Sequence, residues 1–431
     1  MTTEIAVMNK SAISLAADSA VTIGGGNKFY NTANKLFTLS KYHPIGIMVY
    51  SNAEFMGYPV ETIIKEYRKK LGEKFFDTLE EYWDDFVKYI EENFSSEFGV
   101  EDLMVKVYAL INALDKAIKD CAETKIENYI NNSSGDDESF EHKQGKIKEI
   151  ASESISQVIS GMYNEYRSYK DDNNFSDKSE HIKSTIREKV VSIISSTIGS
   201  IDESNIEKIL DIVAMVLTKK HSNGPRTGIV IAGFGEKDLF PKLVNANFMG
   251  VYFGVLKRDD STVNVINNKN AATIIPFAQD DVISTFMTGI DQELQKNILD
   301  TIVKYEVDSC NNEKCIDGLK NEIKQKIDSW SRRVHINPIM ETVEIAPKEE
   351  LAQMAETLVN LTSFRRKLSM DAFSQSVGGP IDVALITKGD GFIWMKRKHY
   401  FDVNKNHHFI QNYFKNNWRD NYEFDNREES I

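Results

Sequence analysis

The feature that most constrains this 431-residue chain is a strand pattern that begins at its very N-terminus. β-rich, largely apolar residues occupy 5–7, a polar break follows, and a second β-rich stretch covers 13–18. Two such runs around a short polar break predict a β-hairpin. With the turn centred near Lys10, partner positions sum to about 20, so Thr2 is predicted opposite Asp18 with Cα atoms roughly 5 Å apart.

A second hairpin is predicted from residues 36–39 and 45–49, which flank a turn at 40–44. Pairing centred between positions 42 and 43 places Lys35 opposite Tyr50. The edges of the two hairpins are therefore predicted to bring together a hydroxyl, a carboxylate, an ammonium group and a backbone amide.

This convergence has a chemical use once Met1 is removed, because Thr2 then carries both a hydroxyl and a free α-amine. The reference pKa of an α-amine is about 7.7–8.0, so it can act as a general base near neutral pH. Thr activated by its own N-terminal amine is a recognised nucleophile. The β-branch of Thr restricts χ1 and holds the hydroxyl in few orientations, and its small size is compatible with removal of Met1.

Several blocks of the chain resemble the N-terminal-nucleophile (Ntn) hydrolases, the family of proteasome β-type subunits and their bacterial ring-protease relatives. The start of a mature β-type subunit is similar to Thr2-Thr3-Glu4-Ile5-Ala6-Val7, Ala16-Ala17-Asp18-Ser19-Ala20-Val21-Thr22 and Asn34-Lys35-Leu36-Phe37. The family's middle and closing strands are similar to residues 228–236 and 378–387. Together these blocks span about half of the chain, and the first is the most specific.

The resemblance implies an α+β fold, the four-layer αββα sandwich of the Ntn hydrolases. It also implies Thr2 as nucleophile, with the charge of Lys35 lowering the pKa of the hydroxyl and Asp18 holding Lys35 ionised and in place. The backbone N–H of Tyr50 would donate to the oxyanion, a contact whose loss costs about 10²–10³ in rate. The family has Gly at that position, so Tyr50 is expected to narrow the cleft and favour small or slender substrates.

Near the C-terminus, residues 369–374 resemble the family's Asp-Ala-Tyr-Ser segment, whose Asp and Ser polarise the catalytic terminus. The match gives these roles to Asp371 and Ser374, with Ser376 as an equally credible partner; the alternative is an ordinary loop into the last hairpin. Where the family has a Ser that orients the N-terminal amine, this chain has Gln279 and Asp280. Asp280 and Asp281 are also interpreted as the N-cap region of a helix over 282–290.

Compared with the family that the chain resembles, the order of helical and strand patterns implies four segments. Residues 1–72 form the first part of the Ntn core, and 73–223 form an inserted helical lobe with stripes of apolar residues at helical spacing. Residues 224–400 complete the core, with strands at 227–232, 248–257, 262–266 and 272–277 and extra helices at about 292–345. The tail 401–431 is rich in Asn and aromatic residues and is expected to dock on the body or on a neighbouring subunit.

Composition narrows the class of function. The formal net charge of −13 argues against nucleic-acid binding, which depends on clustered Lys and Arg. No apolar run approaches the roughly 18 residues of a membrane span, and no charged-then-apolar leader precedes Thr2. Cys121, Cys310 and Cys315 lack metal-site or disulfide spacing. We expect a cytoplasmic protein made without a cleaved leader, with no cofactor, no metal and no membrane partner.

Two functions from different classes follow, with a weaker third. The first is a threonine-type peptidase or amidohydrolase that cleaves peptide or amide bonds in a peptide or protein substrate. The second is a catalytically inactive proteasome-like scaffold whose helical insertion binds a partner protein. The third is an Ntn amidase acting on a small metabolite. Thr2, Asp18 and Lys35 together favour the enzyme, and the resemblance to ring-forming relatives implies a homo-oligomer.

Overall fold

The fold is described from a computed structural model, which covers residues 3–23, 28–94, 97–132, 140–175, 177–220, 225–307, 313–368, 378–408 and 411. The chain forms two compact units. The first comprises Met1–Tyr50, Ala232–Leu243 and Asn264–Ile431, and the second comprises Ser51–Ile231 and Val244–Val263. Both units combine helices with antiparallel strands, so the mixed helix and sheet class predicted from the sequence is confirmed.

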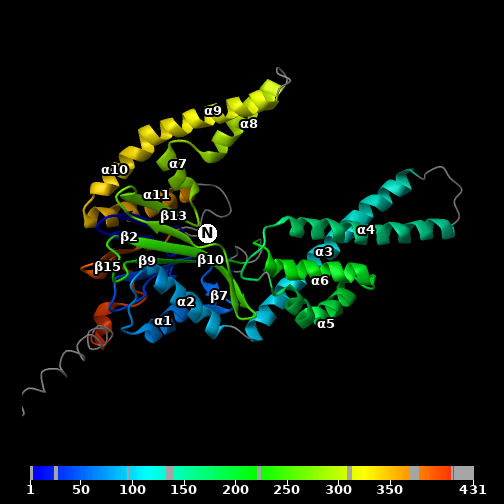
Figure 1. Ribbon diagram of the computed structural model, residues 1–431, viewed down its shortest axis with the longest axis horizontal. Coiled ribbons are helices and arrows are strands. Elements are labelled where there is room, and N and C mark those ends of the chain that lie inside the picture. The colour runs from blue at the N-terminus through cyan, green and yellow to red at the C-terminus, as the bar shows by residue number, and fades with distance from the viewer. Residues whose placement is uncertain are drawn as a thin grey trace, which may run out of the picture. The chain divides into compact units, whose positions relative to one another are not determined.

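The centre of the first unit is a five-stranded sheet with the order β13-β1-β2-β14-β15 (Figure 1). Every neighbouring pair is antiparallel. The N-terminal strand is therefore an interior strand, which pairs on both sides. The strands are β1 (Glu4–Asn9), β2 (Ile13–Ala17), β13 (Ala272–Phe277), β14 (Asp382–Thr387) and β15 (Gly391–Lys396).

Helices cover one face of this sheet. Helix α11 (Lys348–Leu368) packs on β1, β2 and β14, and α10 (Asn337–Ile345) packs on β13 and β1 (Figure 1). Pro347 directly precedes α11, and proline is favoured at the start of a helix because its missing N–H is not needed there. The remaining helical segments of the unit are α7 (Asp281–Thr288), α8 (Gln292–Val307), α9 (Glu313–Ser331), a π-helical turn (Arg332–Ile336) and a short 3₁₀ turn (Val403–Lys405).

The other face of the sheet is covered by a hairpin of β5 (Leu36–Thr38) and β6 (Ile45–Ser51). Gly46 lies so close to the sheet that a Cβ there would be 2.8 Å from both Ile386 Cδ1 and Phe392 Cε2. A residue with a side chain at position 46 would therefore have to displace Ile386 and Phe392. All residues of β1 and β2 are consequently buried on both faces. A small hairpin, β3 (Val21–Ile23) with β4 (Lys28–Tyr30), follows β2.

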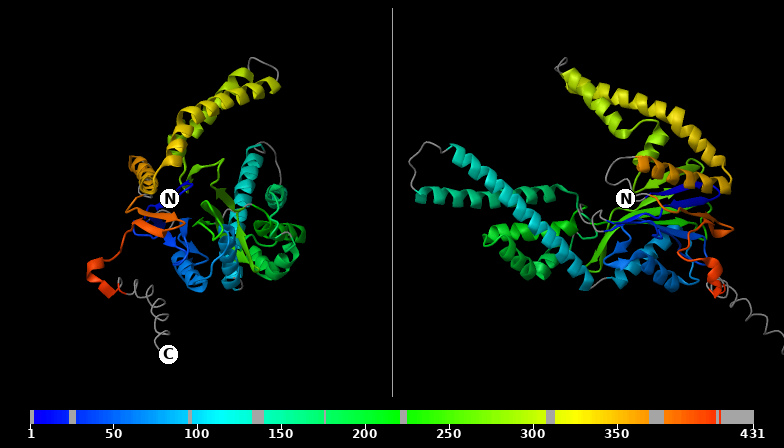
Figure 2. Two further views of the ribbon diagram at one scale, coloured as in Figure 1. Left: turned by 60° about the vertical axis from the view of Figure 1, so that its left-hand side comes forward. Right: turned by 180° about the vertical axis from the view of Figure 1, so that it is seen from behind.

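The second unit is mainly helical. Its helices α3 and α4 lie side by side, as do α5 and α6 (Figure 2). Apolar residues at helical spacing form their common core, which includes Leu103, Ile111, Ile186, Ile193, Leu210 and Val213. The helices are α1 (Val60–Leu71), α2 (Leu79–Asn93), α3 (Glu97–Asn132), α4 (Phe140–Ser168), α5 (Ser179–Thr197) and α6 (Glu203–Thr218).

Strands of the second unit pack against α2. Trp83 and Phe86 of α2 contact the ring of Phe248 with centroid distances of 5.7 and 6.3 Å. The single strand predicted at 248–257 is wrong, because the chain turns back at Phe253–Gly254, both with positive φ, and forms two antiparallel strands. The strands that lie wholly or partly in this unit are β7 (Glu54–Phe55), β8 (Tyr58–Pro59), β9 (Thr227–Gly233), β10 (Lys242–Tyr252), β11 (Val255–Arg258) and β12 (Thr262–Val265).

A buried ion pair fixes one loop of the helical unit to β11. Lys257 Nζ is 2.7 Å from Asp172 Oδ2, and both side chains are almost fully buried. Lys257 also donates to the carbonyl oxygens of Leu217 and Lys219 at 2.7 and 2.6 Å. Burial lowers the pKa of Lys257 from its ordinary value, and the Asp172 carboxylate opposes that effect. The buried ammonium group is thus stabilised by one carboxylate and two carbonyl oxygens rather than by solvent.

We expect Lys257→Met to destabilise the protein by about 3–5 kcal/mol, because it leaves the Asp172 carboxylate buried without its cation. The double variant Lys257→Met/Asp172→Asn removes that unpaired charge and should recover at least half of the loss. Urea unfolding followed by circular dichroism measures both changes. A double variant less stable than the single one would show that the unpaired carboxylate is not the cause.

Some sequence predictions are not tested by these residues. The borders at 72/73, 223/224 and 400/401 stay predictions. Of the predicted tail, residues 409–410 and 412–431 lie outside the described residues. Within the described ranges, no helix is long and apolar enough to cross a membrane.

Candidate active site

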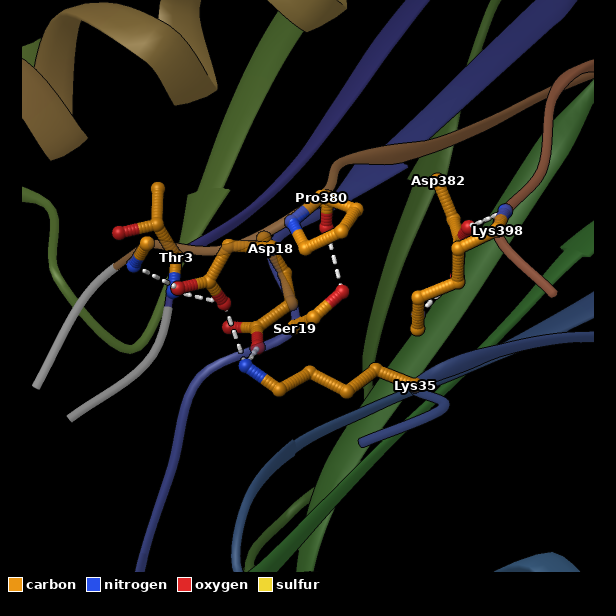
Figure 3. A network of polar contacts seen from close by, with 9 residues as sticks. Thr3, Asp18, Ser19, Lys35, Pro380, Asp382 and Lys398 are labelled. Atoms are coloured by element: carbon orange, nitrogen blue, oxygen red, sulfur yellow. Dashed lines mark hydrogen bonds and ion pairs between the residues drawn. The ribbon is translucent and has the colours of Figure 1, made fainter. Parts of the chain in front are cut away.

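Asp18 and Lys35 form a buried ion pair (Figure 3). Asp18 directly follows the last residue of β2, and Lys35 directly precedes the first residue of β5. The Asp18 side chain is fully buried, and only 6% of the Lys35 side chain is exposed. Two residues that the sequence analysis selected for one site are therefore brought together by two different hairpins.

The Asp18 carboxylate is further held by two backbone amides. Its Oδ1 accepts a hydrogen bond from the Thr3 N–H at 3.2 Å, and its Oδ2 accepts one from the Gly378 N–H at 2.9 Å. The Asp18 N–H in turn donates to the Thr3 carbonyl oxygen at 3.1 Å. Hydrogen bonds to an ionised acceptor are stronger than neutral ones, so this carboxylate ties the start of β1 to the segment before β14.

The segment that supplies Gly378 is itself anchored. The Ser19 N–H donates to the Gly378 carbonyl oxygen at 3.2 Å, and the Ser19 hydroxyl donates to that of Pro380 (Figure 3). Gly379 has φ +81°, and a Cβ there would lie 2.8 Å from Asn31 Cβ. These contacts hold residues 378–380, which precede β14, beside Asp18. Asp371, Ser374 and Ser376, predicted just before these residues, lie outside the described residues.

The predicted register of the first hairpin is wrong by one residue. Glu4 is paired with Ala17, which places Thr3, and not Thr2, opposite Asp18. Thr2 itself lies outside the described residues.

The turn of this hairpin explains the shift. The Asn9 N–H donates to the Ala12 carbonyl oxygen at 3.1 Å. Asn9 Oδ1 accepts from the Ser11 and Ala12 N–H groups at 2.9 and 3.2 Å. Asn side chains commonly stabilise turns in this way. The loop therefore consists of two residues, Lys10 and Ser11, and its centre lies half a residue beyond Lys10.

The second hairpin also differs by one residue from its predicted register. Leu36 pairs with Met48, and the Val49 N–H donates to the Lys35 carbonyl oxygen at 2.8 Å, so Val49 and not Tyr50 lies opposite Lys35. The loop 40–44 is closed by the Leu39 N–H, which donates to the Ile45 carbonyl oxygen at 3.0 Å.

Tyr50 lies near the end of β6 and is buried. Its ring is 5.3 Å from the ring of Phe277, the Cα partner of Glu4 in β13. Successive N–H groups of a strand point to opposite edges. Since the Val49 N–H points toward β5, that of Tyr50 points to the other edge of β6. Its role as an oxyanion donor stays a prediction.

Gln279 and Asp280 follow β13, from which Ala278 separates them. Gln279 is buried, and its Oε1 accepts from Arg366 Nε at 3.0 Å. Arg366 also binds both carboxylate oxygens of Asp281 at 2.8 Å. The predicted capping role of Asp280 is wrong in part: it occupies the N-cap position of α7, but its side chain makes no capping hydrogen bond. Among the described residues, the Gln279 Nε2 group has no hydrogen-bond partner.

Glu4 also belongs to this cluster, although it was not among the residues predicted for the site. Its Oε1 lies 3.1 Å from Lys35 Nζ, and its side chain is fully buried. A signal was available in the sequence, because a carboxylate stands two residues after Thr2 and directly before the apolar run 5–8.

The cluster places one ammonium group and two carboxylates at the first residue of β1, which stands two positions after Thr2 in the sequence. A buried ammonium can stabilise an alkoxide or oxyanion far better than one in water. Across the described ranges, no group of three or more His, Cys, Asp or Glu residues could hold a metal ion.

No protein-family model matches the sequence, and no curated protein matches it. Three similar solved structures are of proteins called Anbu, at TM-scores of 0.27–0.29, which carry no weight for fold or function. Anbu from Hyphomicrobium sp. strain MC1 is 9% identical, and the match covers 100% of this chain and 99% of that chain at a TM-score of 0.28. The helical assembly of the Anbu complex from Pseudomonas aeruginosa is 10% identical, with coverages of 100% and 98% and a TM-score of 0.29. Anbu from Yersinia bercovieri, described as an ancestral β-subunit, is 8% identical, with coverages of 97% and 97% and a TM-score of 0.27.

Proposed function

We propose that this chain is an N-terminal-threonine hydrolase that cleaves peptide or amide bonds, with Thr2 as nucleophile after removal of Met1. The observation that carries the proposal is the buried Lys35 ammonium, paired with Asp18 beside the first residue of β1. Burying ionised groups costs free energy. A scaffold has no need for such a cluster at a chain terminus, whereas an N-terminal nucleophile does.

In the proposed reaction, the Thr2 Oγ attacks the carbonyl carbon of the substrate while its hydroxyl proton passes, through a water, to the α-amine. The carbonyl oxygen becomes an oxyanion, which the Tyr50 N–H is proposed to stabilise. When the C–N bond breaks, the departing amine takes the proton from the α-ammonium group. Water then attacks the resulting ester, with the α-amine again accepting the proton, and this step releases the acid and restores the Thr2 hydroxyl.

Three further assignments belong to this proposal. The sheet, its helical cover and the β5–β6 hairpin of the first unit are compatible with the αββα sandwich, whose four-layer arrangement we propose for the whole core. Asp371 with Ser374 or Ser376 is proposed to orient the α-amine. The substrate is proposed to be a peptide or protein, and the protein a cytoplasmic homo-oligomer.

The test is the covalent state of the N-terminus. The intact mass of purified protein should lack one methionine, because the α-amine must belong to Thr2. A proteasome-type epoxyketone reacts with both the hydroxyl and the α-amine of an N-terminal Thr, so it should form a stoichiometric adduct that peptide mass spectrometry locates on Thr2. Protein with Met1 retained, or a processed N-terminus that forms no adduct, would leave the inactive scaffold as the better interpretation.

A further inference from the structure

The helices that cover the sheet of the first unit leave a groove open at β13, which stands at the edge of that sheet. Residues of β13, α7, α10 and α11 line this groove (Figure 1). Its volume is about 490 Å³, and sites for small molecules typically have volumes of about 300–1,000 Å³. The groove therefore has the size of a small-molecule site.

The inner surface of the groove is apolar. Val343 of α10 and Leu358 of α11 lie at its base and are buried. Three partly buried residues of the same hydrophobic core also line it: Ile274, Ile339 and Met354. Phe286 of α7 forms part of the wall, and 48% of this residue is exposed. An apolar ligand would remove this ring from water, which is favourable in proportion to the area covered.

The rim of the groove carries one negative charge. Glu350, Gln353 and Thr357 are exposed and stand three and four residues apart on α11, so they share one side of that helix. Glu350 is the one charged residue among the described residues that line the groove. Its carboxylate has no ion pair or hydrogen bond with any residue that the structure describes. This charge is therefore available to a ligand.

Basic residues of the surrounding elements do not neutralise Glu350. Within their described residues, α7, α10 and β13 contain no Lys or Arg. Lys348, at the start of α11, is 2.7 Å from Asp390, and Lys10 is 3.3 Å from Glu344. The other basic residues of α11 stand in its last turn, about 22 Å from Glu350 along the helix axis. The rim thus favours a cation.

We propose that this groove binds a small amphiphilic cation, an aliphatic or aryl-alkyl chain that ends in an ammonium group. The chain covers Phe286 and Met354, and the ammonium group pairs with Glu350. A small molecule fits better than a partner protein, because a stable protein interface takes about 800 Å² from each partner. This inference does not depend on the proposed hydrolase activity.

Octylammonium and octanoate are matched probes, because they share an alkyl chain and carry opposite charges at neutral pH. Each is titrated into the full-length protein labelled with ¹³C in its methionine methyl groups. The Met354 signal, identified by its loss in Met354→Leu, reports occupancy of the groove. Octylammonium should bind about 3–10-fold more tightly than octanoate, since Glu350 attracts one head group and repels the other. Equal affinities, or no response of Met354 to either probe, would overturn the proposal.

Two variants of α11 test whether the selectivity comes from the groove. Glu350→Gln keeps the shape of the side chain and should abolish the preference for octylammonium. Glu349→Gln is the matched control: it removes a carboxylate from the same first turn, where the helix dipole favours negative charge, but Glu349 does not line the groove. Its preference should equal that of the wild type. An equal loss in both variants would mean that the general negative charge of the surface, and not the groove, selects the cation.

Phe286→Ala tests the apolar wall. It should weaken both probes by about 3–10-fold, because the exposed part of the ring is what the alkyl chain covers. The ratio of the two affinities should stay at the wild-type value, since the charge of Glu350 is retained. Unchanged binding of both probes to this variant would place the ligand outside the groove and contradict the proposal.

Discussion

Thr2→Ala is expected to abolish epoxyketone labelling and to lower any peptidase activity at least about 10³-fold, because the variant has no nucleophilic oxygen. The fold should be unaffected. Thr2 precedes β1, and substitutions away from the core usually change the free energy of unfolding by less than about 0.5 kcal/mol. Labelling rate, turnover of fluorogenic peptides and urea unfolding of the same preparations measure these three effects.

Thr2→Ser is the matched control, because it keeps the hydroxyl and the α-amine and loses only the β-branch. It should retain labelling at a reduced rate, since its χ1 is less restricted. Wild-type activity in Thr2→Ala would show that any hydrolysis comes from another site or from a contaminant.

Lys35→Met is expected to have the second large effect, on both activity and stability. The substitution leaves Asp18 and Glu4 buried without their shared cation. Removing one partner of a buried ion pair typically costs about 3–5 kcal/mol. Labelling of Thr2 per folded molecule should fall at least about 10²-fold, because the charge that stabilises the alkoxide is gone. Urea unfolding and the labelling rate of the folded fraction measure the two effects separately.

Lys398→Met separates the two effects. It deletes a partly buried lysine that is paired with Asp382 of the same sheet, and the Lys398 N–H still donates to Asp382 Oδ1 at 2.8 Å. It should lose stability but keep the wild-type labelling rate per folded molecule. If both lysine variants slow labelling equally, Lys35 acts only through the fold.

Which residues meet at the site could be predicted in part from the sequence. Asp18 and Lys35 stand out because a carboxylate and an ammonium follow or precede apolar strand patterns at fixed distances from Thr2. Their pairing in the structure agrees with that interpretation. Gly378 could not be predicted, because it contributes a backbone N–H, which has no side-chain signature, from 360 residues away.

The registers show where pattern reasoning loses accuracy. Alternation of apolar residues identifies which residues form strands, but a turn decides which residues are opposite. Asn9 closes a two-residue loop with its own side chain, and this detail moved every predicted pair by one. The turn at Phe253–Gly254 was missed for a related reason: Phe253 has φ +53°, a conformation that an aromatic residue rarely adopts.

Helices were easier to predict than strand registers, because a long stripe of apolar residues at helical spacing, with recognisable ends, fits few other secondary structures. Thr78 and Glu81 have the spacing of a capping box, and the structure has this capping box at the start of α2. Apolar residues at helical spacing between 103 and 118 mark only the part of α3 that is buried. The helix continues to Asn132, where its exposed residues carry little apolar periodicity.

The order of strands in the central sheet also governs when the site can exist during synthesis. β1 and β2 leave the ribosome first, but their outer neighbours are β13 and β14, whose residues lie far along the chain. At about 5–20 residues per second, the 360 residues between Asp18 and Gly378 take on the order of 20–70 s to translate. Throughout that time the Asp18 carboxylate lacks the Gly378 amide, and the β2 edge of the first hairpin lacks its partner β14. The nascent chain therefore cannot hold a completed nucleophilic centre before its last sheet strands have been made.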